Sequence, residues 1–117
     1  MFGVMIPGAL YVSLPYASAA DGDVKSTVEI NDSTTNGPTL TNADRFGRSI
    51  ANIGDMDGDG VNDLAVGAHF DDMDENDDVS GANNRGTIHI LFMNTDGSVK
   101  STVEINDSTA NGPTLSN

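Results

Sequence analysis

The chain has 117 residues, of which 18 are acidic and only 5 are basic, and its formal net charge is −13. This charge argues against a nucleic acid partner, because phosphates need a basic surface, and against binding to anionic membranes. The absence of cysteine excludes disulfides, thiolate metal sites and thiol catalysis. Aromatic residues are only 5% and no long stretch shows a helical period, so we expect an all-β, turn-rich fold.

Residues 1–20 allow two interpretations. The segment is apolar and ends in small residues like those before a signal-peptide cleavage site, but no basic residue precedes its apolar part. In the other interpretation residues 8–14 form a strand, because their alternation resembles that of residues 86–92. We favour the strand. The segment is too short and too interrupted by proline to span a bilayer, so we expect no membrane insertion.

Residues 21–42 and 96–117 are two nearly identical copies, offset by 75 residues. They differ only at Asp23/Ser98, Thr35/Ala110 and Thr41/Ser116. Repeats of this kind are typical of stacked supersecondary units, so we expect further copies in the parent protein. In each copy an Asp-Gly turn precedes apolar–polar alternation, at residues 27–30 and 102–105. The alternation predicts an outer strand with one solvated face, followed by a loop.

Between the two copies the sequence predicts the remaining strands. Residues 46–53 predict a strand, and residues 64–68, an apolar run bounded by polar loops, predict a buried second strand. Residues 86–92 and 101–105 predict the third and fourth strands. The acidic run 71–78 is typical of a solvated loop, and its carboxylates also leave open a second, weaker cation site.

The loop 55–63 concentrates carboxylates between the first two of these strands. They belong to Asp55, Asp57, Asp59 and Asp63. Gly58 and Gly60 allow positive φ, so the alternating side chains can converge, and the Val61 carbonyl can add an oxygen. This set favours Ca²⁺ over Mg²⁺, which requires a smaller octahedral shell. An acidic turn that binds no cation is the alternative, although its carboxylates would repel one another. The loop is not an EF-hand, because Val66 replaces the final Glu and a strand follows.

The residues around the loop resemble the FG-GAP repeat, which builds the β-propeller of integrin α subunits and of many bacterial surface proteins. Phe46-Gly47 precedes the acidic loop and Gly67-Ala68 follows it at the spacing of that repeat. The chain departs from the pattern at His69, where the family has proline. The resemblance implies that the loop holds calcium through the carboxylates of Asp55, Asp57, Asp59 and Asp63 and the carbonyl of Val61.

The resemblance also implies an all-β propeller architecture whose blades each contain four antiparallel strands. We expect about one and a half blades of an incomplete integrin-like propeller. Residues 1–42 would supply the last two strands of a preceding blade and a connecting loop. Residues 43–106 would form one complete blade with its calcium loop, and residues 107–117 would lead to a next blade.

The sequence contains no arrangement of residues typical of catalysis. The two histidines, His69 and His89, lack the pattern of a nucleophile–base pair or a metal triad, and no phosphate-binding glycine loop is present. We therefore expect a non-enzymatic, calcium-binding propeller segment of a secreted or cell-surface protein. Its expected partners are neighbouring blades of the same parent chain and a protein or glycan ligand, as in adhesion. The alternative is a structural accessory region of a larger secreted hydrolase.

Overall fold

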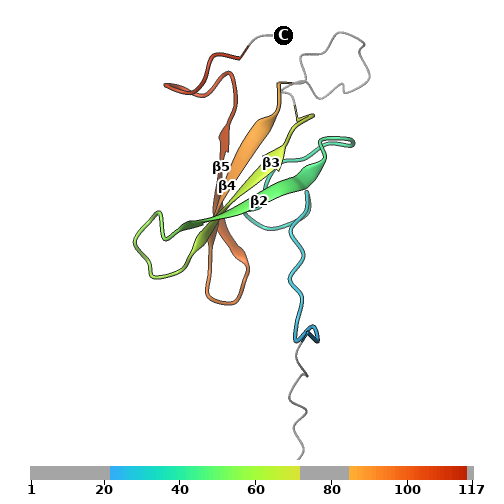
Figure 1. Ribbon diagram of the computed structural model, residues 1–117, viewed down its shortest axis with the longest axis vertical. Coiled ribbons are helices and arrows are strands. Elements are labelled where there is room, and N and C mark those ends of the chain that lie inside the picture. Colours follow the sequence, from blue (N-terminus) through green and yellow to red (C-terminus); the bar gives the residue numbers. More distant parts are fainter. Residues whose placement is uncertain (1–21, 72–84, 116–117) are drawn as a thin grey trace, which may run out of the picture.

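The computed structural model describes residues 22–71 and 85–115 of the chain, which build one antiparallel sheet (Figure 1). Its strands are β2 (Phe46–Gly54), β3 (Asp63–Ala68), β4 (Thr87–Met93) and β5 (Val99–Ile105). They lie side by side in chain order, so each strand pairs with the one before it. Within the described ranges there is no helix with the length and apolar character needed to span a membrane.

The all-β prediction is confirmed, and the four predicted strands between residues 46 and 105 differ from the observed ones only at their ends. Alternating apolar residues suit a pleated sheet, in which successive side chains point to opposite faces. The predicted strand at residues 8–14 and most of the acidic run 71–78 lie outside the described residues.

The hydrophobic core lies on one face of this sheet, here called the covered face. On β4 every second side chain is buried, namely Thr87, His89, Leu91 and Met93. The core cluster consists of Val66, Leu91, Met93 and Val99. The opposite face, here called the open face, carries Ile88, Ile90, Val103 and Ile105, which pair across β4 and β5. Ile88 remains 48% exposed and Val103 49% exposed, so the open face of these strands is both apolar and accessible to solvent.

Residues from the first repeat copy cover the core. The side chain of Ile30 packs against the core cluster, and the Asn36 carbonyl accepts a hydrogen bond from Thr102 Oγ1 on β5 at 2.8 Å. Further along, the backbone carbonyl of Asp44, a buried residue, accepts a hydrogen bond from the Phe70 N–H at 3.3 Å, just beyond β3. In Figure 1 this segment passes behind the sheet before it enters β2. The segment from Ile30 to Asp44 is therefore part of the packed unit.

The two repeat copies form the same turn. The backbone N–H of Asn31 donates to Thr34 Oγ1 at 2.8 Å, and that of Asn106 donates to Thr109 Oγ1 at 2.8 Å. Near-identical sequence thus produces the same local hydrogen bonds, because these bonds join residues close together in the chain.

The strand expected at residues 27–30 of the first copy does not form, whereas the matching residues 102–105 belong to β5. A strand exists through hydrogen bonds with a neighbour. The second copy obtains that neighbour from β4, but the neighbour expected for the first copy is residues 8–14, which lie outside the described ranges. The division of the chain into blade segments at 1–42, 43–106 and 107–117 stays a prediction.

The predicted alternation of β5 is confirmed. Its polar residues Thr102 and Glu104 pair with Leu91 and His89, so they share the face of the core, where Glu104 is exposed at the edge of the sheet. Val103 on the open face is half exposed as well, so both faces of this strand meet solvent.

Candidate metal centre

The acidic loop connects β2 to β3 as a hairpin at one end of the sheet. Gly54 and Asp63 form the last pair of the two strands, and residues 55–62 project beyond them. The turn between β4 and β5 leaves the sheet at the same end (Figure 1). Gly58 has φ 81° and Gly60 has φ 91°, so both adopt the positive φ expected from the sequence. These angles curl the loop back on itself, because glycine adopts them without steric cost.

Asp55 organises the backbone of the loop. Its Oδ1 accepts hydrogen bonds from the N–H groups of Gly58 at 2.7 Å and Asp59 at 3.0 Å, and its Oδ2 accepts one from Gly60 at 2.8 Å. The Gly60 bond is the main cause that lowers the pKa of the Asp55 carboxyl below its usual value of 3.8, and the other two bonds act in the same direction. Asp55 therefore keeps the ionised form, which is the one that binds a cation.

Asp63 fixes the end of the loop to the sheet. Its side chain is fully buried. Its Oδ2 accepts a hydrogen bond from the Met56 N–H at 2.7 Å, and its Oδ1 accepts one from the Met93 N–H at 3.0 Å. One carboxylate therefore joins the start of the loop to the end of β4. A buried carboxylate is tolerated here because both of its oxygens are hydrogen-bonded.

Three of the predicted ligands converge. One carboxylate oxygen from each of Asp55, Asp57 and Asp63 lies within 4.8 Å of the others. Calcium binds oxygens at about 2.3–2.6 Å, so oxygens that share one ion lie at most about 5 Å apart. The group fits that limit. Asp55 and Asp57 are exposed whereas Asp63 is buried, so the site would open to solvent on one side, where water could complete the shell.

Asp59, the fourth predicted carboxylate, is not part of this group. Its Oδ1 accepts the Val61 N–H at 2.8 Å, and its Oδ2 contacts the ammonium group of Lys100. This bond to Lys100 is the main cause that lowers the pKa of Asp59. Lys100 also pairs with Asp57, which is the main cause that raises the pKa of the lysine. The Val61 side chain packs against the core, and the ligand role of its carbonyl stays a prediction.

Sequence reasoning missed Lys100, which lies 41 residues from Asp59. Its only local signal is its place two residues after an Asp-Gly-Ser turn, at the start of β5. Finding it would have required knowing that the β4–β5 turn and the acidic loop lie at the same end of the sheet.

His89 was expected to be a packed strand residue, and this is confirmed. It is fully buried, with its ring in edge contact with Phe46 at a centroid distance of 5.4 Å. Its Nε2 lies 2.8 Å from Asp71 Oδ2, and its Nδ1 lies 3.7 Å from Glu104 Oε1. These contacts tie β4 to β5 and to the segment after β3, on the covered face and apart from the acidic loop.

The comparison with known families agrees with this geometry. The FG-GAP repeat family matches residues 46–91. This segment is an FG-GAP repeat. The FG-GAP repeat includes β2, the acidic loop, β3 and β4 as far as Leu91, so the convergent carboxylates lie inside it. The four-stranded antiparallel sheet is consistent with one blade of an FG-GAP propeller. Comparisons with curated proteins and with solved structures give no match.

Proposed function

We propose that the loop 55–63 binds calcium and that the ion stabilises this FG-GAP blade. The observation that carries the proposal is the convergence of three carboxylate oxygens within 4.8 Å on a loop that its own backbone already holds in shape. Calcium suits this loop better than magnesium because it accepts several protein oxygens in flexible geometry, whereas magnesium needs near-octahedral geometry and keeps much of its water. The FG-GAP match supports the same assignment independently.

Calcium binding by the full chain tests this proposal. We expect isothermal titration calorimetry to show uptake of calcium by the wild-type chain. The double variant D57A/D59A should lose this uptake, because it removes two of the loop's four carboxylates. The control variant D96A removes the carboxylate of the Asp-Gly turn between β4 and β5 and leaves the loop intact. Unchanged stoichiometry and affinity in D57A/D59A would place calcium binding elsewhere in the chain.

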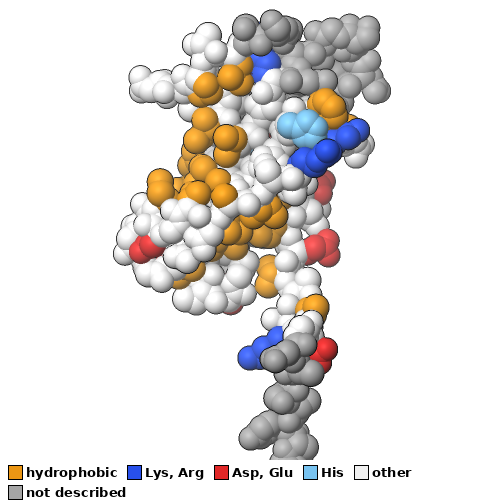
Figure 2. Space-filling view, viewed as in Figure 1, with side chains coloured by type: hydrophobic (Ala, Val, Ile, Leu, Met, Phe, Trp, Pro, Cys, Tyr) orange, Lys and Arg blue, Asp and Glu red, His pale blue; other side chains and the backbone are white. Residues whose placement is uncertain are grey.

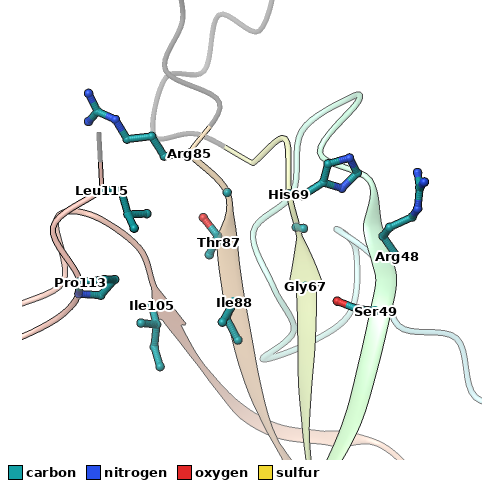
Figure 3. A pocket seen from close by; sticks show the side chains of 12 residues that line it. Arg48, Ser49, Gly67, His69, Arg85, Thr87, Ile88, Ile105, Pro113 and Leu115 are labelled. Carbon is teal, nitrogen blue, oxygen red and sulfur yellow. The ribbon is translucent and has the colours of Figure 1, made fainter. Parts of the chain in front are cut away.

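We further propose that the open face packs against a neighbouring blade of the parent protein. Apolar side chains gather in a band over β4 and β5 (Figure 2). At the end opposite the acidic loop this face includes a groove of about 600 Å³ whose lining contains Ile88, Ile105, Pro113 and Leu115 (Figure 3). Exposed apolar surface of this extent is typical of an interaction surface.

The repeat supports a blade as the occupant of the open face. Ile30 of the first copy packs on the core cluster of this sheet. Ile105 holds the same place in the second copy but lies on the open face. If each copy covers the sheet that follows it in the chain, Ile105 would pack on the core of the next blade. Pro113 is exposed here, but it would then become buried, as its counterpart Pro38 in the first copy is.

With its apolar open face uncovered, the chain by itself should self-associate. The double variant I88T/V103T should reduce this self-association, because it makes the open face more polar with little change in side-chain shape. Static light scattering over a range of protein concentrations measures this effect. V24T is the matched control, since Val24 is 80% exposed and is not part of the open face. Equal scattering by I88T/V103T and the wild type would contradict the docking role of the open face.

For the whole protein, we propose a non-catalytic role in a secreted or cell-surface setting, with adhesion to a protein or glycan as the activity. The strongly acidic composition and the proposed calcium loop support this setting, because an extracellular medium supplies calcium to relieve charge repulsion. The complete reading frame of the parent gene tests the proposal. Further repeats with a surface anchor would support it, whereas an attached catalytic domain would indicate an accessory region of a hydrolase.

A further inference from the structure

Lys100 brings a positive charge to the proposed calcium loop from another strand. Its Nζ lies 2.5 Å from Asp57 Oδ2 and also contacts Asp59 Oδ2. Both carboxylates are among the predicted calcium ligands, and Asp57 belongs to the convergent group of three. The lysine thus contacts one carboxylate inside that group and one outside it.

The position of Lys100 is set by the sheet. Val99, its neighbour in the chain, pairs with Met93 on β4, next to a shift in the β4–β5 register. The Met93 N–H in turn donates to Asp63, the buried carboxylate at the end of the loop. The loop and the start of β5 are therefore anchored to the same residue of β4, which keeps the lysine within reach of the loop.

We propose that Lys100 is a tethered competitor of the metal, which sets the calcium affinity of this loop. The inference rests on the proposed function. The ammonium group and a divalent cation compete for the same two carboxylates, those of Asp57 and Asp59, and two cations cannot share them without repulsion. Calcium must therefore displace Lys100, and Asp59 can turn toward the ion only when the lysine releases it. The half-buried stem of Lys100 is flexible enough to move its charged end into solvent.

The repeat provides an internal reference for this residue. Lys25 occupies the place of Lys100 in the first copy and is exposed. Removal of either lysine changes the net charge of the chain equally. Of these two lysines, it is Lys100 that contacts Asp57 and Asp59. A difference between the two variants therefore reports the local contact and not the overall charge.

The first test is calcium affinity measured by calorimetry on the full chain. Each exposed ion pair contributes only a modest free energy. K100M loses the two pairs with Asp57 and Asp59 that calcium must otherwise break, so its calcium affinity should be about three- to tenfold higher than that of the wild type. K100R should bind like the wild type because it keeps the charge, and K25M should also bind like the wild type. Wild-type or weaker binding by K100M would overturn the competitor role. If neither the wild type nor K100M binds calcium, the proposed function itself fails and this inference fails with it.

The second test follows the lysine directly in the wild-type chain. Amine acetylation read by mass spectrometry should modify Lys100 more slowly than Lys25 in chelator, because Lys100 is held between two carboxylates. Saturating calcium should raise the Lys100 rate toward that of Lys25 and leave Lys25 unchanged. A Lys100 rate that does not respond to calcium, in a chain that binds calcium, would show that the lysine stays in place and would overturn the inference alone.

Discussion

Replacing Asp63 with alanine should lower the free energy of unfolding by about 2–4 kcal/mol. The Asp63 carboxylate accepts two backbone hydrogen bonds, from Met56 at the start of the loop and from Met93 at the end of β4. The alanine variant leaves the buried Met93 N–H without a partner, and such an unpaired donor costs about 1–3 kcal/mol. The Met56 N–H is only partly buried, so water can replace part of its lost bond.

Urea denaturation followed by circular dichroism, in excess chelator, measures this loss without a contribution from metal. D59A is the matched control, because it removes an exposed carboxylate of the same loop and should cost much less. D63N should fall between the two, since its amide keeps one acceptor oxygen but turns a donor toward the second N–H. A D63A variant as stable as D59A would contradict the anchoring role of Asp63.

Local sequence patterns were sufficient to predict the four strands between residues 46 and 105 and the loop between β2 and β3. Alternation in residues 86–92 predicted β4, and the glycines at 58 and 60 predicted the positive φ values of the hairpin. The spacing also predicted the convergence of Asp55, Asp57 and Asp63, but it included Asp59, which contacts Lys100 instead. Each of these features depends on residues close together in the chain, where side-chain period and backbone sterics decide the outcome.

Contacts between distant residues could not be predicted in this way. The Lys100 pairs with Asp57 and Asp59 depend on two turns that meet at one end of the sheet. The bond from Met93 to Asp63 joins residues 30 apart. The period of β5 likewise did not tell that Thr102 and Glu104 share a face with Leu91 and His89, because this depends on the pairing of β5 with β4. Register, which sets these partners, is not contained in the period of a single strand.

Calcium should raise the thermal stability of the chain by a predictable amount. If only the folded state binds the ion, stabilisation is about 2.7 kcal/mol when free calcium is 100 times the dissociation constant. The gain arises because the ion neutralises carboxylates that otherwise repel one another in the loop. Magnesium should stabilise less at equal concentration, because it needs near-octahedral geometry at short distances and gives up its water ligands reluctantly.

The most direct test of the calcium-stabilised blade is the thermal midpoint of the full chain, followed by circular dichroism in calcium, in magnesium and in chelator. We expect the midpoint to be highest in calcium and to rise with its concentration. The variant D57A/D59A should show the same midpoint in calcium as in chelator. Equal midpoints for the wild-type chain in calcium and in chelator would contradict the account and leave the loop 55–63 as an acidic hairpin turn.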